Sequence, residues 1–515
     1  MKPLRAYYLP PGLEQGVETV VQRFGPAHDA VEVELPLVTP ADLGRWIDGL
    51  LEARRERLAA RPTRSIARVL ERVARRFLAA DDPVRREALD GLARTGRFDR
   101  RAVAHALDHA FGPLTRGGID LWLKAELGST DALDRLVSRR DGPPRRAHGP
   151  EWMLQVYAGN VPAIPVWPLC GALLLKSALL AKTASREPLL APLLARAIAE
   201  EDPGLGACLA VVWWKGGAEE LDRAALYRAP ALLAFGGSGA MAALARAARP
   251  EAIVVLHGPR VSVSCVAREA LTAARYADLA RRAAADIALY DQQGCLSPHA
   301  IYVERGGRVS PGDFASALGE ALAAAAGAAA APRFAAEADP VEAASVQLYR
   351  AQAAFEAAQG ERATRVLGSP GASGWTVVVE EGARFEPTPA HRTVRVHAVA
   401  ELGEACAALG PVSRFIESVG LEAPGPRGAS AAAAIAALGI PRIAPLGKLQ
   451  EPSPLAAHGG VGYLAPFARW TSVDAGRELR PPRRAGPSSG GRARGRPASR
   501  PSGRGSRRAG PGSRP

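Results

Sequence analysis

The chain has 515 residues, of which 47% are hydrophobic, and carries a formal net charge of +14. This length and composition are ordinary for a soluble globular protein with two or more domains. The five scattered cysteines include no CxxC pair and no Cys/His spacing suited to zinc, so a disulfide framework and a structural metal site are both disfavoured.

The N-terminal residues MKPLRAYYLPPGLEQ contain no apolar stretch of signal-peptide length. The longest apolar runs, at 171–175 and 177–181, are interrupted by Lys176 and Lys182, so neither is long enough to span a membrane. Because cysteines are also few, we expect a cytoplasmic protein without a membrane segment.

From about residue 40 to 125 the pattern is helical, after a candidate N-cap at Ser65. Apolar residues fall on one helix face at Ile66, Val69, Leu70, Val73 and Phe77, and the spacing repeats at Val103, Leu107 and Phe111. We expect residues 1–149 to form a mostly helical packing region, with the arginines between these positions on its solvated face. The Gly, Pro and charge cluster at 139–150 predicts a linker or long loop.

From residue 151 onward, short strand-like runs alternate with helical segments. The predicted strands are 179–182, 210–213, 232–235 and 253–256. Such alternation favours a largely parallel sheet that is covered on both faces and binds ligands at the carboxyl ends of its strands. Within it, residues 231–248 read as a strand, a Gly236-Gly237-Ser238-Gly239 turn and a helix, which is either a phosphate-binding turn or an ordinary one.

A third α/β stretch has predicted strands at 376–379 and 394–399 and a helix near 314–332. It contains the segment DIALYDQQGCLSPHAIYVE, residues 286–304. Gly294 would let a substrate approach the Cys295 thiol, a candidate nucleophile that needs donors aimed at a developing oxyanion. Taken alone, the loop favours a structural cysteine, because free cysteines are usually buried and inert.

The C-terminal tail, residues 476–515, consists mainly of Arg, Gly, Pro and Ser and is predicted to be disordered. Eleven arginines and no acidic residue lie within 480–515, so the rest of the chain carries a net charge of only +3. The tail offers charge for RNA or another polyanion but no aromatic residue for stacking, so nucleic-acid binding is disfavoured.

The segment YAGNVPAIPVWPLCGALLLKSALLAKTAS, residues 157–185, changes the interpretation. It resembles the aldehyde dehydrogenase superfamily, in which Asn-x-Pro opens a helix and a lysine follows about two dozen residues later, and Asn160 and Lys182 take those places. The Gly236-Gly237-Ser238 turn resembles the family's cofactor-phosphate turn, and Gln293-Gly294-Cys295 its nucleophile loop. More narrowly, GNVP, KSALLAKTAS and QQGCLSP resemble the acyl-CoA reductases, which include the fatty acid reductases of bacterial bioluminescence. The resemblance spans roughly residues 40–475.

This resemblance implies an aldehyde dehydrogenase-like α/β fold. A Rossmann-type NADP(H)-binding domain is expected at 150–264 and an α/β catalytic domain with Cys295 at 265–475. Residues 1–149 would pack on the cofactor domain, and the tail at 476–515 lies outside the resemblance.

The resemblance also implies a reaction. Cys295 would attack the thioester carbonyl of a long-chain acyl-CoA, NADPH would deliver hydride, and the thiohemiacetal would collapse to an aldehyde. The Asn160 side chain and the Cys295 backbone N–H are the expected oxyanion donors. The cofactor would be bound by Lys182, Ser185, Arg186, Gly236, Gly237 and Ser238. The alternatives without a catalytic or cofactor role are that Asn160 caps a loop and that Lys182 is a solvated lysine at the end of a strand.

Two departures from the wider superfamily matter. The family's glutamate base is replaced by the segment Leu256-His257-Gly258-Pro259, which predicts slow hydrolysis of an acyl-enzyme. His257 is either a base itself or a structural histidine. Ser185-Arg186 stands where NAD-preferring relatives often have an acid, so NADPH is favoured while NADH stays open. Glu380 and Glu401 are the candidates for a further cofactor-ribose ligand, although neither sits in the expected motif.

The expected acyl donor is acyl-CoA or an acylated partner protein. Relatives often work beside an acyl-protein synthetase and a thioesterase, and a homo-oligomer is expected from the fold. The main alternative is an assembly protein that keeps the fold without the chemistry, a possibility that the presence of Cys295 and Asn160 argues against.

Overall fold

The computed structural model describes residues 3–25, 30–96, 98–138, 142–327, 340–360, 363–370, 374–453 and 455–474. The predicted tail, 476–515, lies outside these ranges, and so does the polyanion-binding alternative that rests on it. Within the described ranges, no helix combines the length and the apolar character that crossing a bilayer requires.

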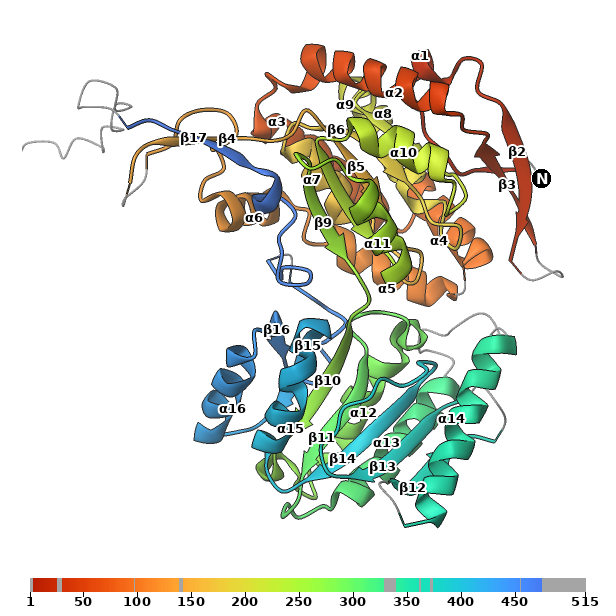
Figure 1. Ribbon diagram of the computed structural model, residues 1–515, viewed down its shortest axis with the longest axis vertical. Coiled ribbons are helices and arrows are strands. Elements are labelled where there is room, and N and C mark those ends of the chain that lie inside the picture. Colours follow the sequence, from red (N-terminus) through yellow and green to blue (C-terminus); the bar gives the residue numbers. More distant parts are fainter. Residues whose placement is uncertain are drawn as a thin grey trace, which may run out of the picture.

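The first lobe is built around a five-stranded parallel sheet with strand order β7-β6-β5-β8-β9 (Figure 1). Its strands are β5 (Trp152–Val156), β6 (Ala178–Lys182), β7 (Leu209–Val212), β8 (Ala231–Phe235) and β9 (Ile253–His257). The four strands from β7 to β8 are almost wholly buried, because neighbouring elements cover both faces of the sheet. The predicted strands and their parallel arrangement are confirmed.

Helices surround this sheet, and those between residues 40 and 127 form the predicted helical stretch that precedes it. They are α2 (Pro40–Ala53), η1 (Arg54–Leu58), α3 (Thr63–Leu78), α4 (Pro83–Thr95), α5 (Arg100–Phe111), α6 (Arg116–Leu127), α7 (Val166–Leu174), α8 (Leu190–Glu201), α9 (Pro203–Gly206), α10 (Glu219–Arg228) and α11 (Ser238–Ala247). The predicted apolar faces of α3 and α5 are buried, and Phe77 stacks on Phe111 at 4.2 Å between ring centroids. Ser65 is not the N-cap, because α3 already begins at Thr63 after Pro62.

The N-terminal residues form a small sheet that the sequence analysis did not predict. It contains β1 (Leu4–Arg5), β3 (Val31–Pro36) and β2 (Thr19–Phe24), with the short helix α1 (Pro11–Glu14) between β1 and β2. Val31, Val33 and Leu35 are buried and the glutamates between them are less so, which is the period-two pattern of a half-buried strand. The region 1–149 is therefore only partly helical.

The second lobe contains a seven-stranded sheet with order β12-β13-β14-β11-β10-β15-β16 (Figure 1). All neighbours are parallel except β12 and β13. Its strands are β10 (Val261–Val266), β11 (Pro298–Glu304), β12 (Ala363–Gly368), β13 (Thr376–Glu381), β14 (Thr393–Val399), β15 (Ile416–Glu422) and β16 (Arg442–Ala444). The predicted strands at 376–379 and 394–399 lie within β13 and β14.

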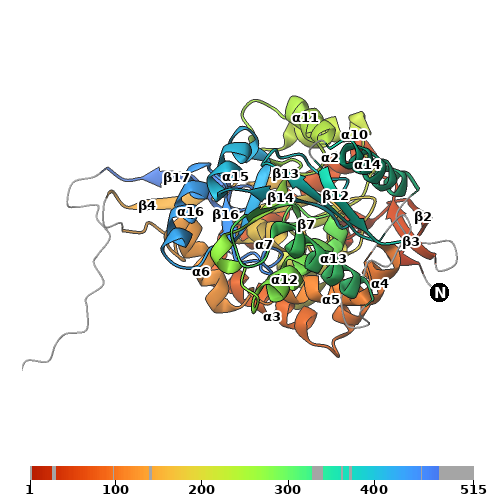
Figure 2. The same ribbon diagram turned by 90° about the horizontal axis from the view of Figure 1, so that it is seen from below.

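Helices cover both faces of the larger sheet, so its central strands are buried. One core contains α12 (Tyr276–Ala288) and α13 (Pro311–Gly327), and another contains α15 (Leu402–Leu409) and α16 (Pro426–Ala437). Figure 2 shows α15 on one side of β14 and α12 and α13 on the other. The remaining helical elements are α14 (Pro340–Ala358), η2 (Arg268–Ala270), η3 (Leu289–Gln292), η4 (Gly410–Phe415) and η5 (Ala465–Phe467).

The chain crosses between the lobes twice. The first crossing lies between β9 and β10, so the predicted boundary after residue 264 falls inside β10. The C-terminal segment then returns to the first lobe, where Leu464 and Phe467 join its core. There β17 (Arg469–Ser472) pairs antiparallel with β4 (Arg145–His148). The predicted linker at 139–150 therefore contains a strand, and the last residues assigned to the catalytic domain belong to the first lobe.

Candidate active site

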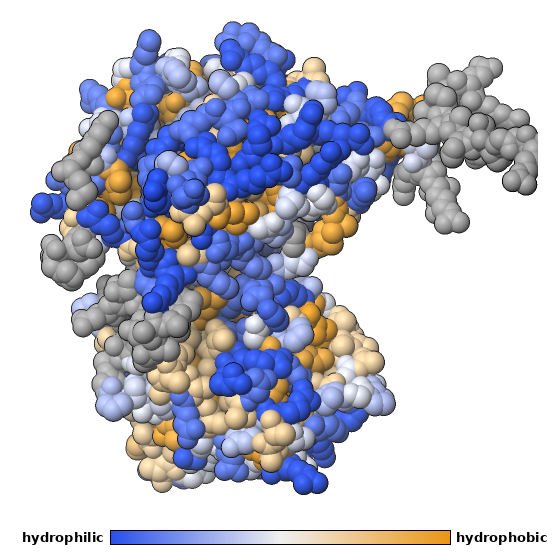
Figure 3. Space-filling view, turned by 180° about the vertical axis from the view of Figure 1, so that it is seen from behind, coloured by the Kyte–Doolittle hydropathy of each residue, from blue (hydrophilic) through white to orange (hydrophobic). Residues whose placement is uncertain are grey.

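A cavity of about 510 Å³ lies where the two lobes meet. The carboxyl ends of β5, β8 and β9 face the amino ends of β10, β11 and β15 across it. The molecule narrows between the lobes when it is seen from behind (Figure 3). Polar and aromatic residues from both lobes and from the returning C-terminal segment line the cavity, among them Asn160, Phe235, His257, Arg260, Gln293, Cys295, Glu417, His458 and Tyr463.

The loop that carries Cys295 adopts an unusual backbone conformation. Tyr290, Asp291 and Gln292 have φ angles of 56°, 51° and 62°. Each non-glycine residue in this left-handed region costs about 1–2 kcal/mol. Such a turn persists only where surrounding contacts hold it, and strained backbone of this kind is concentrated at functional sites.

Side chains of the loop supply those contacts. The Gln292 amide nitrogen donates to the backbone oxygens of Pro298 and Thr393, at 2.7 and 2.8 Å, and its oxygen accepts from the Thr393 N–H at 2.8 Å. Asp291 Oδ2 lies 2.6 Å from His391 Nδ1. His391 lies in a second left-handed turn, 390–392, so the two strained turns are fastened to each other.

Cys295 is the one cysteine of the five that lines the cavity; Cys170, Cys208 and Cys265 are buried elsewhere and Cys406 is half-buried. Burial raises the pKa of the Cys295 thiol to about 12, and the negative charge of Glu417 adds to this effect. Hydrogen bonds from the backbone N–H groups of Cys295 and Leu296 act in the opposite direction, as does Arg260. The sulfur is therefore a neutral thiol at pH 7, and the backbone N–H groups of Cys295 and Leu296 lie close to it.

Asn160 follows β5 and lines the same cavity. Its side-chain nitrogen donates to the backbone oxygen of Gln293 at 2.7 Å, two residues before Cys295. An amide nitrogen carries two hydrogens, so a second donor position is left for a ligand atom. The fold thus brings together the two residues that the sequence analysis selected as catalytic, and the hydrogen bond also fits the loop-stabilising alternative for Asn160.

The glycine turn after β8 is open to a ligand. Gly236 and Gly237 line the cavity, and Ser238 is the first residue of α11. Gly237 caps this helix without a side-chain hydrogen bond, and a Cβ at Gly237 would meet no atom within 4 Å. Backbone N–H groups at an open helix start bind phosphate well, so these residues fit the phosphates of a dinucleotide.

The other predicted cofactor residues, Lys182, Ser185 and Arg186, lie outside the cavity wall. Lys182 ends β6, where burial lowers its pKa, while Asp222 opposes the shift. Ser185 accepts a hydrogen bond from Trp213 Nε1 at 3.2 Å, and Arg186 Nη2 lies 3.7 Å from Glu342 Oε1. Their role as cofactor ligands therefore stays a prediction.

His257 ends β9 and lies in the segment, 256–259, that the sequence analysis compared with the family's glutamate-containing segment. Its ring stacks on Phe235 at 4.8 Å and meets the His458 ring edge-on at 4.5 Å. Burial lowers the pKa of His257 to about 3, with smaller effects of His458 and Arg260. An imidazole with so low a pKa is neutral and a weak base, so the geometry favours a packing role over base catalysis.

The two candidate ribose glutamates lie at the wrong edge of the seven-stranded sheet. Glu380, near the end of β13, is buried and bonded to Arg395, and Glu401 is exposed at the start of α15. Both are at the carboxyl edge, whereas the cavity opens at the amino edge. Neither is therefore placed to contact a ligand in the cavity.

Sequence reasoning missed Glu417, His458 and Tyr463 as residues of the site. Glu417 had a signal, since it is a carboxylate near the start of the apolar strand FIESVGL. Charged residues are almost never fully buried without a partner, so such a position is conspicuous. His458 and Tyr463 had no such local signal, because the returning C-terminal segment places them.

A sequence profile of the acyl-CoA reductase (LuxC) family matches residues 58–470. The chain belongs to this family. The LuxC-type long-chain acyl-protein thioester reductase of Photorhabdus luminescens is 30% identical over 191 residues, covering 36% of this chain and 39% of the relative. The enzyme of the same name from Aliivibrio fischeri is 28% identical over 181 residues, 34% and 36% of the two chains. The match thus spans about two fifths of these curated relatives.

Solved structures agree on the fold of this LuxC family member. Aldehyde dehydrogenase 21 from Physcomitrella patens superimposes with a TM-score of 0.70 at 14% identity, over 92% of this chain and 98% of that one. An NAD-dependent benzaldehyde dehydrogenase from Corynebacterium glutamicum gives 0.68 at 15% identity, over 91% and 98%. The predicted aldehyde dehydrogenase-like α/β fold is confirmed.

Proposed function

We propose that the protein reduces a fatty acyl thioester to the aldehyde through an acyl-enzyme on Cys295, with NADPH as the favoured cofactor. The observation that carries this proposal is the shared cavity, which holds the Cys295 thiol, the Asn160 amide and an open glycine turn at a helix start. Family membership supports it, because the family is described as acyl-CoA reductases.

The chain's own residues account for acyl transfer. The Cys295 sulfur attacks the thioester carbonyl, and the carbonyl oxygen becomes negative in the transition state. In this proposal the Asn160 amide and the backbone N–H of Cys295 stabilise that charge, and one such donor contributes about 3 kcal/mol. The leaving thiol departs, and the acyl group stays on the sulfur.

NAD(P)H, when bound, supplies the hydride that reduces the acyl group. In this proposal Gly236, Gly237 and the first N–H groups of α11 bind its phosphates. Lys182, Ser185 and Arg186 lie along the same edge of the five-stranded sheet and would bind its ribose, with Arg186 favouring a 2′-phosphate. His257 is too weak a base to activate water well, so it would not promote hydrolysis of the acyl-enzyme.

The cavity wall suits an apolar acyl chain. Ala106 and Ala110 of α5 line it together with Val161, Ile164 and Trp167. Small and apolar side chains of this kind bury methylene groups favourably, at about 0.8 kcal/mol for each group. The donor is acyl-CoA or an acylated partner protein, and the printed names of the curated relatives favour the acylated protein. An acyl-protein synthetase, a thioesterase, a homo-oligomer and a cytoplasmic location stay predictions.

The test uses the full chain with an acyl-labelled long-chain acyl-CoA and, separately, an acylated carrier protein. We expect one acyl group on each chain, released by hydroxylamine, and conversion of the label to aldehyde when NADPH is added. Cys295→Ala should abolish both. Cys406→Ala is the matched control, since Cys406 is half-buried outside the cavity and its loss should leave both unchanged.

Label that persists in Cys295→Ala would contradict the acyl-enzyme. If the protein is instead a non-catalytic assembly protein, neither acyl label nor aldehyde should form with any donor. Replacing NADPH by NADH tests the cofactor preference. Only a lower KM for NADPH agrees with the proposal that Arg186 binds the 2′-phosphate.

A further inference from the structure

A buried carboxylate that the proposed reaction has not used lines the same cavity as Cys295. Glu417, near the start of β15, is only 4% exposed and lines the cavity with Cys295. Its Oε1 accepts from the Gly459 N–H at 2.8 Å. Its Oε2 has no hydrogen-bond partner within the described part of the chain and lies 3.6 Å from Arg260 Nε. One oxygen is thus held in place and the other is left for a ligand or a proton.

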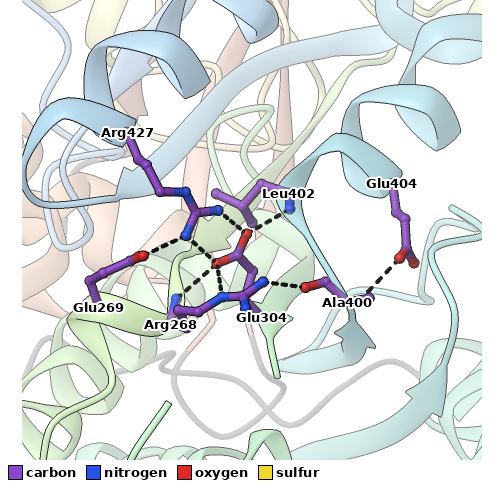
Figure 4. A network of polar contacts seen from close by, with 7 residues as sticks. All are labelled: Arg268, Glu269, Glu304, Ala400, Leu402, Glu404 and Arg427. Atoms are coloured by element: carbon purple, nitrogen blue, oxygen red, sulfur yellow. Dashed lines mark hydrogen bonds and ion pairs between the residues drawn. The ribbon is translucent and has the colours of Figure 1, made fainter. Parts of the chain in front are cut away.

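A second buried carboxylate in the same sheet is bonded differently. Glu304, at the carboxyl end of β11, is fully buried, and both of its oxygens are bonded (Figure 4). They accept from the backbone N–H groups of Arg268 and Leu402, at 3.0 and 2.8 Å, and from the side chains of Arg268 and Arg427. Glu304 is therefore hydrogen-bonded through both of its oxygens, whereas Glu417 is hydrogen-bonded through one.

We propose that Glu417 is the general base of acyl transfer, accepting the proton of the Cys295 thiol and returning it to the leaving thiol. The proposal rests on the proposed function and adds a proton acceptor for the Cys295 thiol, a role for which His257 is too weak a base. The proton moves directly or through one water, the two routes open to a general base.

The step balances without a co-reactant. As the Cys295 sulfur forms its bond to the acyl carbon, the S–H proton passes to Glu417 Oε2, and the carbonyl becomes an oxyanion. The oxyanion then collapses, the bond from the acyl carbon to the leaving sulfur breaks, and that sulfur takes the proton from Glu417. The carboxylate is restored, and no electron pair is gained or lost by the protein.

The surroundings support Glu417 over its neighbours. The charged and titratable groups around it are Arg260, Arg442, Cys295, His458 and Tyr463. Burial lowers the pKa of His458 as it does that of His257, so both imidazoles are weak bases. The negative charge of Glu417 also raises the pKa of Cys295. The proton thus stays on the sulfur in the free enzyme and leaves during the attack.

The experiment compares two reactions of Cys295 in Glu417→Gln. The first is acyl transfer from p-nitrophenyl butyrate, followed as a burst of p-nitrophenolate and as one acyl mass on Cys295. The second is alkylation by iodoacetamide as a function of pH, which reports the thiolate directly. We expect acyl transfer at pH 7 to fall by about 100-fold or more, because the base is lost. The pH midpoint of alkylation should fall, because a repelling charge is lost.

These opposite directions separate a base from a bystander. If Glu417 acts only by repelling the thiolate, the variant will accelerate both reactions, which would overturn the proposal. Equal rates of acyl transfer in the variant and the wild type would overturn it as well. Glu417→Asp should recover part of the acyl transfer.

Glu422→Gln is the matched control, because Glu422 ends the same strand and pairs with Arg282 and Arg275 away from the cavity. It should leave both reactions unchanged. The ester probe needs neither the natural donor nor a cofactor. If thioesters give no acyl-enzyme while the ester burst depends on Glu417, the proposed substrate is wrong and the base assignment stands.

Discussion

Two buried carboxylates at opposite edges of the seven-stranded sheet, Glu417 and Glu304, are bonded differently. At the amino edge, Glu417 keeps one oxygen without a hydrogen bond and the loop before Cys295 is strained. At the carboxyl edge, Glu304 is bonded through both oxygens to two arginines and two backbone N–H groups. Buried polar groups in folded proteins are normally paired, so an exception marks either strain or function. In the proposed reaction Glu417 takes part in the chemistry, whereas Glu304 contributes to stability.

The two large sheets also present opposite ends to the cavity. The five-stranded sheet offers the carboxyl ends of its strands, as expected for a parallel α/β sheet. The seven-stranded sheet offers its amino ends, where Cys295 precedes β11 and Glu417 lies near the start of β15. The rule that ligands bind at the carboxyl ends of parallel strands therefore locates only the part of the site that belongs to the five-stranded sheet. The part at the amino ends of the seven-stranded sheet depends on how the two lobes pack together.

Among the remaining variants, the largest effect is expected in the cavity, in Asn160→Ala. Loss of an oxyanion donor should slow acyl-enzyme formation on the order of 100-fold, which corresponds to about 3 kcal/mol in the transition state. The rate is measured in single turnovers by quenched-flow mass spectrometry. Alkylation of Cys295 by iodoacetamide serves as the control, because an intact loop keeps that rate. An unchanged acylation rate would leave only the loop-stabilising role for Asn160.

A smaller effect is expected at the carboxyl edge, in Glu304→Gln. The variant loses charged hydrogen bonds to Arg268 and Arg427, so the free energy of unfolding should fall by about 2–3 kcal/mol. Urea denaturation measures this change. The acylation rate of the folded fraction should match the wild type, and a slower rate would show that the two edges are not separate in function.

The pH dependence of the free energy of unfolding gives a second test of the role of Glu304. Burial alone would raise the pKa of Glu304, but hydrogen bonds from Arg427, Arg268 and Leu402 lower it from 4.5 to about 2. The contribution of Glu304 to stability is therefore complete above about pH 4.5 and is lost as the pH falls towards 2. In that window the wild type should lose more stability than Glu304→Gln. Parallel curves for the two proteins would contradict this assignment.

The smallest effect concerns the strained turn that faces the Cys295 loop. Ala390 has a φ of 63°, so Ala390→Gly relieves left-handed strain while it adds backbone freedom to the unfolded chain. The net change should lie between zero and about 1 kcal/mol of stabilisation. Ala434→Gly, at an exposed position inside α16, is the matched control and should cost about 1 kcal/mol. Equal losses in thermal unfolding would mean that residue 390 carries no strain.

Much of the fold could be predicted because its signals are local. Helical spacing identified the buried faces of α3 and α5, and short apolar runs identified β6, β7, β8 and β9 of the first sheet but not β5. The order of Asn160, the glycine turn and Cys295 along the chain was enough to indicate the family. The N-terminal sheet was missed although its strand β3 has a clear period-two pattern.

The amino-acid sequence by itself determined many of the elements, the family and a candidate nucleophile, because each depends on residues that are close along the chain or arranged in a recognisable order. Only the tertiary structure decided which edge of each sheet faces the cavity, that Glu380 and Glu401 lie away from it, and that Glu417 lies in it. It also decided that the C-terminal segment returns to deliver His458 and Tyr463. The physical reason is that these positions depend on contacts between residues more than a hundred positions apart, and no local pattern encodes them.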